Sequence, residues 1–178
     1  MRSSTCLLRG DARPPEAVKA LGGFRSRGSN PSLQKHVKGA LSGTDACVDS
    51  GYISMTRDYM RARKFARNQF VTMPGDDVDR VTHIYIVKTT GVLYDVTTFM
   101  RECPFEGDDE QEVAAFGLVP WVQVMGWFSL TWPAGKEYTA IVYSEIVRNP
   151  DRNPSLEPMS FSDDFSKDRC GLTTRATS

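Results

Sequence analysis

Long hydrophobic runs are absent from this sequence, and so is an excess of charge of either sign. No segment approaches the ~20 apolar residues of a membrane-spanning helix, and residues 1–10 lack the apolar region of a secretory signal peptide. The 22 basic and 22 acidic side chains give a formal net charge of zero, which excludes a general attraction to nucleic acid or membrane surfaces. We therefore expect no membrane span, and either a cytosolic protein or a secreted chain from which a leader has been removed.

Cysteine is scarce, and the glycine-rich loops that hold nucleotides in many folds are missing. The four cysteines lie too far apart for a metal-binding knuckle, so we expect no metal site, although they allow disulfides in more than one connectivity: Cys6, Cys47, Cys103 and Cys170. Neither GxGxxG nor GxxxxGK[ST] occurs. A bound nucleotide would therefore not be held by a glycine-rich turn between a strand and a helix. Internal repeats are also absent.

The length of 178 residues predicts one domain that is large enough to bury a core without a metal or a second subunit. Hydrophobic residues make up 40% of the chain and charged residues 25%, which is ordinary for a globular protein. We expect the domain core to span about residues 7–148. Residues 149–178 form a polar tail rich in Pro, Ser, Asp and Thr, a composition typical of disorder unless the tail is attached to the core.

Helices are predicted in the first half of the chain. A proline pair before residues 15–21 and a glycine pair after them bound a short helix. Asn30 as cap and Pro31 as first residue begin a second helix, which continues to residue 37 and ends before Gly39. A third helix follows a short strand at residues 53–56 and carries its apolar residues on one face: Tyr59, Ala62, Phe65, Ala66 and Phe70. Its basic residues lie mainly opposite, which is weak evidence for an anionic partner.

Strands are predicted in the second half. Residues 81–88 alternate as a strand with a buried face does, and residues 92–96 form the next strand, before an irregular connection over 99–109. Residues 119–130 are rich in valine and aromatic side chains, which favours a buried strand. Residues 138–147 pair with residues 122–131 across a turn centred on Gly135. The order predicts an α+β fold with a helical first half and a strand-rich second half.

Residues 108–128, DDEQEVAAFGLVPWVQVMGWF, contain the strongest candidate for chemistry. If Glu110, Gln111 and Glu112 are extended, the two glutamates leave the same face with their Cα atoms ~7 Å apart. Both carboxylates could then act on one bound substrate. Taken by itself, the segment is more typical of a solvated acidic loop before a buried strand.

Polar groups occur at three other points where a simple core does not require them. The first is LLRGDARPP, with Arg9, Asp11 and Arg13 after an apolar start; either an arginine–aspartate pair or an adhesion signal at residues 9–11 could explain it. The second is GYISMT, where Ser54 and Thr56 share one face of a strand, although either could simply cap the next helix. The third is a histidine at residue 36, and a lone histidine in a short helix is usually a surface or core group.

The order of these four features resembles the catalytic subunits of cholera toxin and heat-labile enterotoxin and, more loosely, that of pertussis toxin. These subunits are mono-ADP-ribosyltransferases marked by an arginine, a Ser-Thr-Ser and a Glu/Gln-x-Glu motif. Here the middle motif reads Ser54-Met55-Thr56, and the resemblance spans about residues 7–130, densest at DEQEVAAFGLVPWVQVMGWF. The resemblance implies an ADP-ribosyltransferase fold, with two packed, mostly antiparallel sheets around an NAD cleft.

The resemblance also implies roles for individual residues in binding NAD. Arg9 would hold the nicotinamide and phosphate side of NAD, and Asp11 and Arg13 would shape the same pocket. Ser54, together with Thr56 on the same strand face, would support the catalytic glutamate. The histidine at residue 36 matches the histidine that follows the first helix in the family.

Glycosyl transfer from NAD needs a carboxylate on the ribose. Cleavage of the bond to nicotinamide develops oxocarbenium character, which a carboxylate on the ribose 2′-hydroxyl stabilises, and we assign Glu112 to that role. Glu110 would orient the acceptor and take its proton. In the family, Glu-x-Glu accompanies arginine acceptors, whereas members that modify guanine in DNA carry Gln-x-Glu. We therefore expect a protein arginine, in a G-protein by resemblance, and not nucleic acid.

Pertussis-like relatives suggest a Cys47–Cys170 disulfide that ties the tail back, with Cys6 and Cys103 either bonded to each other or free. The resemblance implies a secreted toxin that acts inside a host cell, with a separate delivery subunit. An NAD glycohydrolase, a transferase that modifies a DNA base and an adhesion module that uses Arg9, Gly10 and Asp11 are the alternatives.

Overall fold

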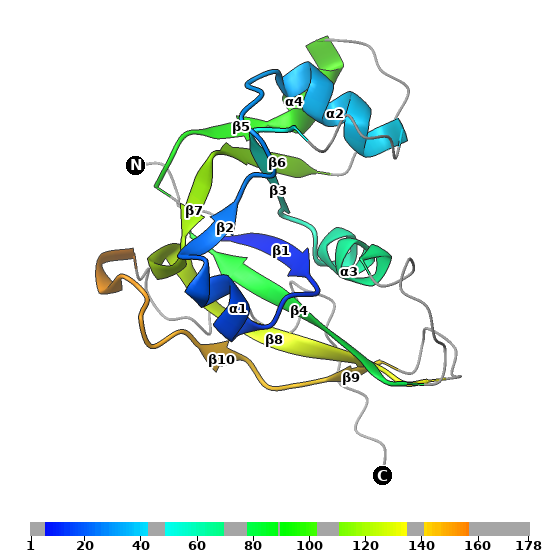
Figure 1. The fold of residues 1–178 in the computed structure, drawn as a ribbon, viewed down its shortest axis with the longest axis vertical. Coiled ribbons are helices and arrows are strands. Elements are labelled where there is room, and N and C mark those ends of the chain that lie inside the picture. The colour runs from blue at the N-terminus through cyan, green and yellow to red at the C-terminus, as the bar shows by residue number, and fades with distance from the viewer. Residues whose placement is uncertain are drawn as a thin grey trace.

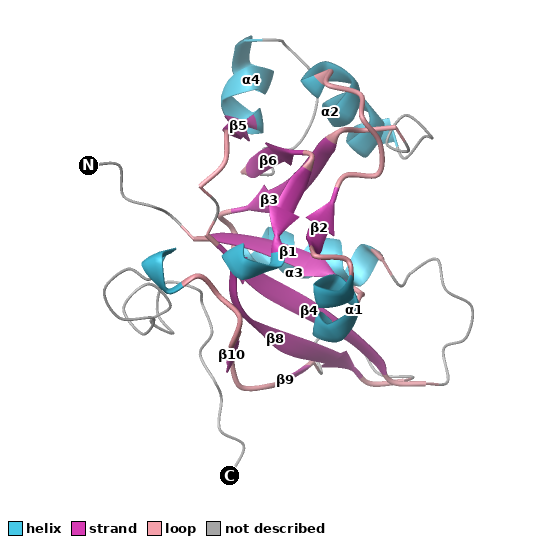
Figure 2. Ribbon diagram, turned by 60° about the vertical axis from the view of Figure 1, so that its left-hand side comes forward, coloured by secondary structure: helices cyan, strands magenta, loops and turns pink. Residues whose placement is uncertain are grey.

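The computed structural model describes residues 6–42, 49–69, 78–88, 90–102, 111–134 and 141–156. Within these ranges, eight strands form one antiparallel sheet in the order β10-β8-β4-β1-β3-β6-β5, with β9 also paired to β8 (Figures 1 and 2). Its strands are β1 (Leu7–Asp11), β3 (Tyr52–Thr56), β4 (Arg80–Val87), β5 (Leu93–Asp95), β6 (Glu112–Phe116), β8 (Val124–Trp132), β9 (Val142–Tyr143) and β10 (Val147–Arg148). A small second sheet pairs β2 (Gly23–Arg25) with β7 (Leu118–Pro120).

Helices cover both faces of the main sheet. They are α1 (Pro15–Ala20), α2 (Leu33–Ser42), α3 (Tyr59–Asn68) and α4 (Val96–Glu102), and 3₁₀ turns occur at Trp121–Gln123 and Pro154–Leu156. In both ribbon views α2 and α4 lie together at the end of the sheet that carries β5, whereas α3 lies beside β1. The expected α+β fold is confirmed, with a main antiparallel sheet and a small second sheet.

Successive side chains of β1 point to opposite faces of the main sheet, so they contribute to two separate core clusters. Leu7 packs on one face with residues of α1, β2 and β7, in a cluster that includes Phe24 and Tyr85. Leu8 points to the other face and packs with Ala62 of α3, as the two-residue repeat of a strand requires. Both sides of β1 are buried, so the first strand of the chain lies in the middle of the sheet.

A glycine in β1 allows α3 to approach the sheet closely. A Cβ atom at Gly10 would lie 2.1 Å from the main-chain oxygen of Ala62 and 2.6 Å from the main-chain nitrogen of Ala66. Backbone atoms cannot move aside as the end of a flexible side chain can. The contact of strand and helix at this point therefore requires glycine.

Strands β1 and β3 pair at one end and separate at the other. Their register contains the pair Leu8 and Thr56 within the described residues, and beyond it β3 turns toward α2 while β1 continues toward α3 (Figure 1). β1 instead pairs along its whole length with β4, from Leu7 opposite Val87 to Asp11 opposite His83. The divergence opens a space between Arg9 and Ser54 on the two strands.

Several predicted helix boundaries are confirmed and others are wrong. α1 matches the first predicted helix. The second helix begins later than expected, because the Ser32 hydroxyl accepts from the Lys35 N–H at 3.2 Å and so caps it, and it continues through Gly39. The third helix is confirmed as α3, but Asp58 caps it, accepting from the Arg61 N–H. Phe70 lies outside the described residues.

The prediction of an irregular connection over residues 99–109 is wrong at its start, because α4 occupies Val96–Glu102. Asp95 Oδ1 accepts from the Thr98 N–H at 3.1 Å, which caps this helix. Val96 is buried against Val37 of α2 and Ala114 of β6. Tertiary burial therefore outweighs the low helix propensity of the β-branched residues.

The extended backbone considered for residues 110–112 does not occur at Gln111. Gln111 has a φ of +47°, in the left-handed region that few residues other than glycine adopt, and β6 begins at Glu112. The two-residue alternation of an extended chain is therefore interrupted at Gln111. Glu110 itself lies outside the described residues.

The predicted long strand over residues 119–130 is divided at Pro120 into β7, a 3₁₀ turn and β8. The predicted pairing of residues 138–147 with 122–131 is confirmed within residues 141–147 by β9 and β10, which both pair with β8. Residues 138–140 lie outside the described residues. Gly135 lies outside the described residues.

The start of the polar tail is attached to the core by hydrogen bonds. Asn149 is fully buried and its Nδ2 donates to the main-chain oxygens of Trp121 at 3.1 Å and Val124 at 2.8 Å. Asp151 accepts from Trp121 Nε1 at 2.9 Å and pairs with Lys19. Cys47, Cys103 and Cys170 lie outside the described residues, and Cys6 is half-buried beside the α3 core cluster. No helix among the described residues is long and apolar enough to span a membrane.

Candidate active site

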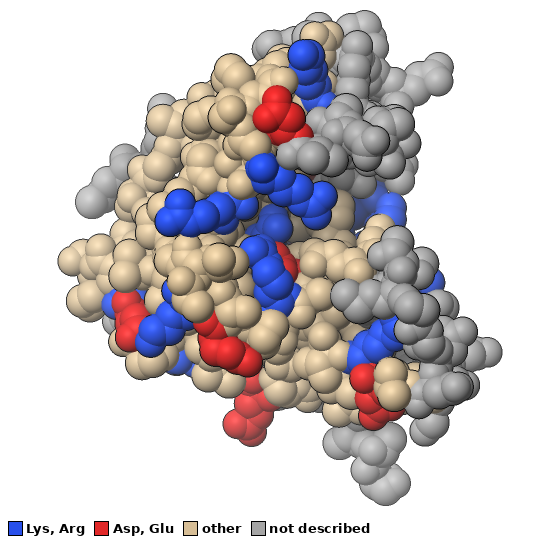
Figure 3. Space-filling model, in the orientation of Figure 1, with Lys and Arg blue, Asp and Glu red and all other residues tan. Residues whose placement is uncertain are grey.

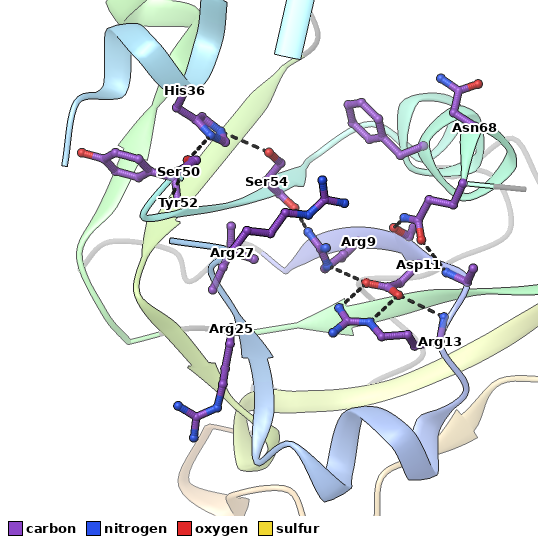
Figure 4. A pocket seen from close by; sticks show the side chains of 15 residues that line it. Arg9, Asp11, Arg13, Arg25, Arg27, His36, Ser50, Tyr52, Ser54 and Asn68 are labelled. Atoms are coloured by element: carbon purple, nitrogen blue, oxygen red, sulfur yellow. Dashed lines mark hydrogen bonds and ion pairs between the residues drawn. The ribbon is translucent and has the colours of Figure 1, made fainter. Parts of the chain in front are cut away.

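A cavity of about 760 Å³ lies where β1 and β3 separate, within the size range of small-molecule sites. Its walls come from β1 and the turn after it, the segment after β2, α2, β3 with the residues before it, and the end of α3 (Figure 4). The polar side chains that line it are Arg9, Asp11, Arg13, Arg25, Arg27, His36, Ser50, Tyr52, Ser54, Asn68 and Gln69. Basic side chains gather across the middle of the face drawn in Figure 3.

Asp11 organises the arginines on the β1 side of the cavity. Its side chain is 2% exposed and accepts from Arg9 Nε at 3.1 Å, from Arg13 Nε at 2.8 Å and from Arg13 Nη2 at 2.6 Å. The main-chain N–H of Arg13 donates to Oδ1 at 3.0 Å. The bidentate pairing fixes the plane of the Arg13 guanidinium group, and a single bond ties Arg9 to the same carboxylate.

Burial and charge act in opposite directions on this cluster. Burial would raise the pKa of Asp11, but hydrogen bonds from Arg13 and the charges of Arg9 and Arg13 together lower the pKa below its ordinary value. Burial lowers the pKa of Arg9, although Asp11 opposes this, whereas the hydrogen bonds to Asp11 raise the pKa of Arg13. Because an arginine side chain stays protonated far above neutral pH, both guanidinium groups are charged and the cluster carries a net positive charge.

Arg9 spans the opening between the two strands. Its Nη1 donates to the main-chain oxygen of Ser54 at 2.8 Å, and its Cζ lies 5.0 Å from the centre of the Phe24 ring, within cation–π distance. Together with the bond to Asp11, these contacts hold the guanidinium from three sides. The remaining N–H groups are available to an anionic ligand in the cavity.

His36 connects the cavity to Glu112. Its Nε2 lies 3.0 Å from Glu112 Oε1 and 3.2 Å from Ser54 Oγ, and its Nδ1 lies 2.7 Å from Ser50 Oγ. His36 and Glu112 are both largely buried, at 6% and 4% exposed. Glu112 is not among the residues that line the cavity, so it is linked to the cavity through the imidazole.

The structure brings most of the predicted site residues together. Arg9, Asp11, Arg13, Ser54 and His36 all line the cavity. Thr56 does not, because its side chain is fully buried and its hydroxyl accepts from the Asp58 N–H at 3.0 Å. Glu110 cannot be placed in this group, since it lies outside the described residues.

Sequence reasoning missed several residues of the cavity. Arg27 is exposed and points toward Arg9 in Figure 4, whereas Arg25 points away from it. Gln69 joins α3 to β1, since its Oε1 accepts from the Ala12 N–H at 2.8 Å and its Nε2 donates to the Gly10 oxygen at 2.9 Å. The pair of arginines in FRSR was a usable signal. Ser50 gave none, because one serine in a small-residue segment is ordinary.

The adhesion alternative is not supported by this geometry. An adhesion tripeptide must present its aspartate to a receptor, but Asp11 is buried and satisfied by two arginines. Gly10 is covered by α3. Arg9, Gly10 and Asp11 belong to a central strand.

The arrangement suits a phosphate-bearing ligand that also reaches a carboxylate. Arginines held in fixed planes bind phosphate oxygens by paired hydrogen bonds, and the cavity presents Arg9 and Arg27 together. Among the described residues, no three His, Cys, Asp or Glu side chains are grouped to hold a metal ion.

Residues 2–151 match the family model described as the heat-labile enterotoxin alpha chain. The NAD(+)–arginine ADP-ribosyltransferase Chelt of Vibrio cholerae is 32% identical over 131 residues, which cover 67% of this chain and 20% of that protein. One chain of heat-labile enterotoxin IIB of Escherichia coli is 30% identical over 138 residues, which cover 71% of this chain and 49% of that one. The chain thus spans about half or less of the length of these relatives.

Solved structures share the fold at lower identity. EcPltA aligns with a TM-score of 0.64 at 19% identity, covering 86% of this chain and 90% of that one. Scabin toxin from Streptomyces scabies in complex with NADH aligns with a TM-score of 0.55 at 20% identity, covering 86% of this chain and 79% of that one. A guanine-specific ADP-ribosyltransferase aligns with a TM-score of 0.53 at 18% identity, covering 86% of this chain and 81% of that one. The toxin ADP-ribosyltransferase fold is therefore present, and with the family match over residues 2–151 the chain belongs to the heat-labile enterotoxin alpha chain family.

Proposed function

We propose that the protein is a mono-ADP-ribosyltransferase that uses NAD as its substrate and releases nicotinamide. The observation that carries the proposal is the convergence on one cavity of a fixed arginine, Arg9, and of His36, which is hydrogen-bonded to Glu112. The arginines suit the two phosphates of a dinucleotide, and the carboxylate suits its ribose. A ligand that carries both groups matches the arginines of the cavity and the carboxylate that His36 links to it.

Each side chain has a physical role in this proposal. Arg9 and Arg27 bind the phosphates and orient the nicotinamide half of NAD, while Asp11 keeps Arg9 and Arg13 in position. Glu112 accepts from the ribose 2′-hydroxyl and stabilises the positive charge that develops as the bond to nicotinamide breaks. The hydrogen bond from His36 supports this proposal because it occupies one carboxylate oxygen, Oε1, and leaves Oε2 for the ribose.

The proposed acceptor is an arginine of a host protein. A guanidinium is protonated at neutral pH and must lose its proton as it attacks, and Glu110 is proposed to take it. The identity of residue 110 favours this acceptor, because a glutamate accepts a proton and a glutamine does not. The relative Chelt is named as an arginine-specific enzyme. The fold is shared with a guanine-specific enzyme, so a DNA base is the acceptor to test against arginine.

The test is to incubate the protein with labelled NAD and measure nicotinamide release and label transfer to agmatine, a protein mixture and a guanine-containing oligonucleotide. Glu112→Gln should abolish both activities. Glu110→Gln should abolish transfer to agmatine while nicotinamide release persists. Glu145→Gln, an exposed glutamate outside the cavity, is the matched control and should behave as wild type.

Each outcome separates the proposed function from its rivals. Nicotinamide release without transfer to any acceptor would identify an NAD glycohydrolase, and label on the oligonucleotide would identify a base-modifying enzyme. If Glu112→Gln kept both activities, the assignment of Glu112 would be refuted. Mass spectrometry of the labelled protein mixture reports the acceptor residue and the target, for which a G-protein is the first candidate.

The proposal extends to the biological setting. We infer a secreted toxin of one catalytic domain that acts inside a host cell and is delivered by a separate subunit, because the relatives are named as enterotoxin chains. A disulfide between Cys47 and Cys170 would complete the attachment of the tail that Asn149 begins. Peptide mass mapping of the unreduced protein tests that bond directly.

A further inference from the structure

Ser50 is buried at the edge of the cavity and is held from several directions. It is 6% exposed and forms an isolated parallel bridge with Asn30. Its main-chain oxygen accepts from the Gly28 N–H at 2.9 Å, and its hydroxyl accepts from the Tyr52 N–H at 3.1 Å. The Ser50 hydroxyl lies 2.7 Å from His36 Nδ1. A short hydrogen bond to a histidine from a side chain this firmly held can fix the orientation of the ring.

The partners of His36 determine which ring nitrogen carries the proton. Nε2 lies 3.0 Å from Glu112 Oε1, and an ionised carboxylate can only accept a hydrogen bond. Nε2 must therefore carry a hydrogen. In a neutral imidazole the other nitrogen then has no hydrogen and must accept, so the Ser50 hydroxyl donates to Nδ1.

The opposite tautomer leaves the hydrogen of the Ser50 hydroxyl without an acceptor. With the hydrogen on Nδ1, the lone pair of Nε2 would face the Glu112 carboxylate at 3.0 Å, and only the longer contact, at 3.2 Å from the Ser54 hydroxyl, could donate to it. The Ser50 oxygen would accept from both Tyr52 and His36, and its own hydrogen would then point at no acceptor among the hydrogen bonds of the described residues. A polar group without a partner in a buried site costs about 1–3 kcal/mol, which favours the first arrangement.

We propose that Ser50 is a positioning residue that sets the tautomer of His36, so that the imidazole donates to Glu112 from Nε2. Ser50 touches neither NAD nor the acceptor in this scheme; it acts through His36. The donated hydrogen bond holds the Glu112 carboxylate in one orientation for the ribose hydroxyl. The catalytic consequence rests on the proposed function of Glu112, whereas the tautomer is a property of the protein alone.

The tautomer can be measured without any activity assay. His36 and His83 are the two histidines of the chain, so protein labelled with ¹⁵N-histidine gives two sets of imidazole signals, and a His83→Gln variant assigns them. We expect neutral His36 to carry its hydrogen on Nε2. A hydrogen on Nδ1 in the wild-type protein would overturn the proposal, whether or not the protein cleaves NAD.

Variants of Ser50 test the consequence for Glu112. Ser50→Ala should give a mixture of His36 tautomers and lower kcat for nicotinamide release about tenfold, with KM for NAD changed less than about twofold, because the loss falls on the transition state. Ser50→Thr retains a hydroxyl and should restore both readouts. Thermal unfolding of each variant verifies that it is folded.

A second serine–histidine pair provides the matched control. Ser129 Oγ lies 3.1 Å from His83 Nδ1, away from the cavity. Ser129→Ala should shift the His83 signals and leave nicotinamide release at the wild-type level. An unchanged tautomer in Ser50→Ala, or a changed tautomer with unchanged kcat, would refute the positioning role. A wild-type protein that does not cleave NAD would refute the proposed function instead, and the tautomer measurement would still decide the assignment of Ser50.

Discussion

Arg9 donates from Nη1 to the main-chain oxygen of Ser54 at 2.8 Å, between strands that no longer pair with each other at this point. One side chain thus closes the gap between β1 and β3 and also lines the cavity that the gap creates. Its position depends on a fork of nitrogens, since Nε is bonded to Asp11 while Nη1 reaches Ser54. A compact ammonium cannot make both bonds from one place.

Replacing Arg9 with lysine should therefore impair NAD binding although the charge is kept. We expect kcat/KM for nicotinamide release to fall about 100-fold, which corresponds to about 2.7 kcal/mol of transition-state stabilisation. Steady-state kinetics with NAD measure the effect. Arg57→Lys, which alters an exposed pair with Asp95, should stay within about twofold of wild type; full activity in Arg9→Lys would show that the fork is not needed.

Asp11 should make the stability of the protein sensitive to acid. The unfolded chain protonates Asp11 near the ordinary pKa of 3.8, whereas in the folded state the pKa is lowered below that value. The carboxylate therefore stabilises the fold fully above pH 3.8, and this contribution is lost as the pH falls through the folded-state pKa. Asp11→Asn should cost about 3 kcal/mol at pH 7, because it leaves buried charge unpaired.

Urea unfolding measured between pH 3 and pH 7 tests this prediction. The difference in free energy of unfolding between wild type and Asp11→Asn should shrink as the pH falls below about 4. Glu145→Gln removes an exposed carboxylate and should give a curve parallel to wild type. A constant difference across the whole range would contradict a lowered Asp11 pKa.

Gly10→Ala should destabilise the fold by more than about 3 kcal/mol, because the added methyl overlaps the backbone of α3. Gly117→Ala provides the comparison, since Gly117 has a φ of +80° but open space around its Cα. That substitution should cost only about 1 kcal/mol of backbone strain. Thermal and urea unfolding of both variants show which substitution destabilises the protein more. Equal effects would mean that α3 can shift away from β1.

Asn149 should be as important for stability as a residue of the apolar core. Asn149→Ala removes the side-chain donor to the Trp121 and Val124 oxygens. The Trp121 oxygen still accepts from the Val124 N–H, so we expect a cost of about 1–3 kcal/mol in total. Asn149→Asp should cost more, because a carboxylate of the same shape cannot donate and faces two carbonyl oxygens. Asn153→Ala, at an exposed turn, is the control. Limited proteolysis after residue 149 in the Asn149 variants would report release of the tail.

Local patterns predicted the parts of the fold in which burial and sequence agree. The proline and glycine pairs around α1 and the apolar face of α3 identify these helices because capping and amphipathicity are local properties. Two errors have a different origin. α4 forms because Val96 is buried by residues from α2 and β6. Gln111 adopts a positive φ. The residues next to Val96 and Gln111 in the sequence indicate neither feature.

The sequence predicted those site residues that lie in motifs shared with the toxin family. Arg9, Asp11 and Arg13 were found because they lie within one short segment. Ser50 and Gln69 were not, because their importance comes from contacts made across the fold, to His36 and to Gly10. Thr56 was assigned to the cavity by strand alternation, but the local turn to Asp58 takes its hydroxyl.

Because β1 lies in the middle of the sheet, the cavity can form only after the strands on both sides of β1 have been synthesised. β1 is synthesised before its neighbours β3 and β4, and β4 needs β8 on its other side. Contacts between such distant segments form slowly, because long loops must close before the contacts gain free energy. We expect the arginine-lined cavity and the strand pairing to appear together in one late cooperative step, so that a nascent or partly unfolded chain carries no NAD-cleaving activity.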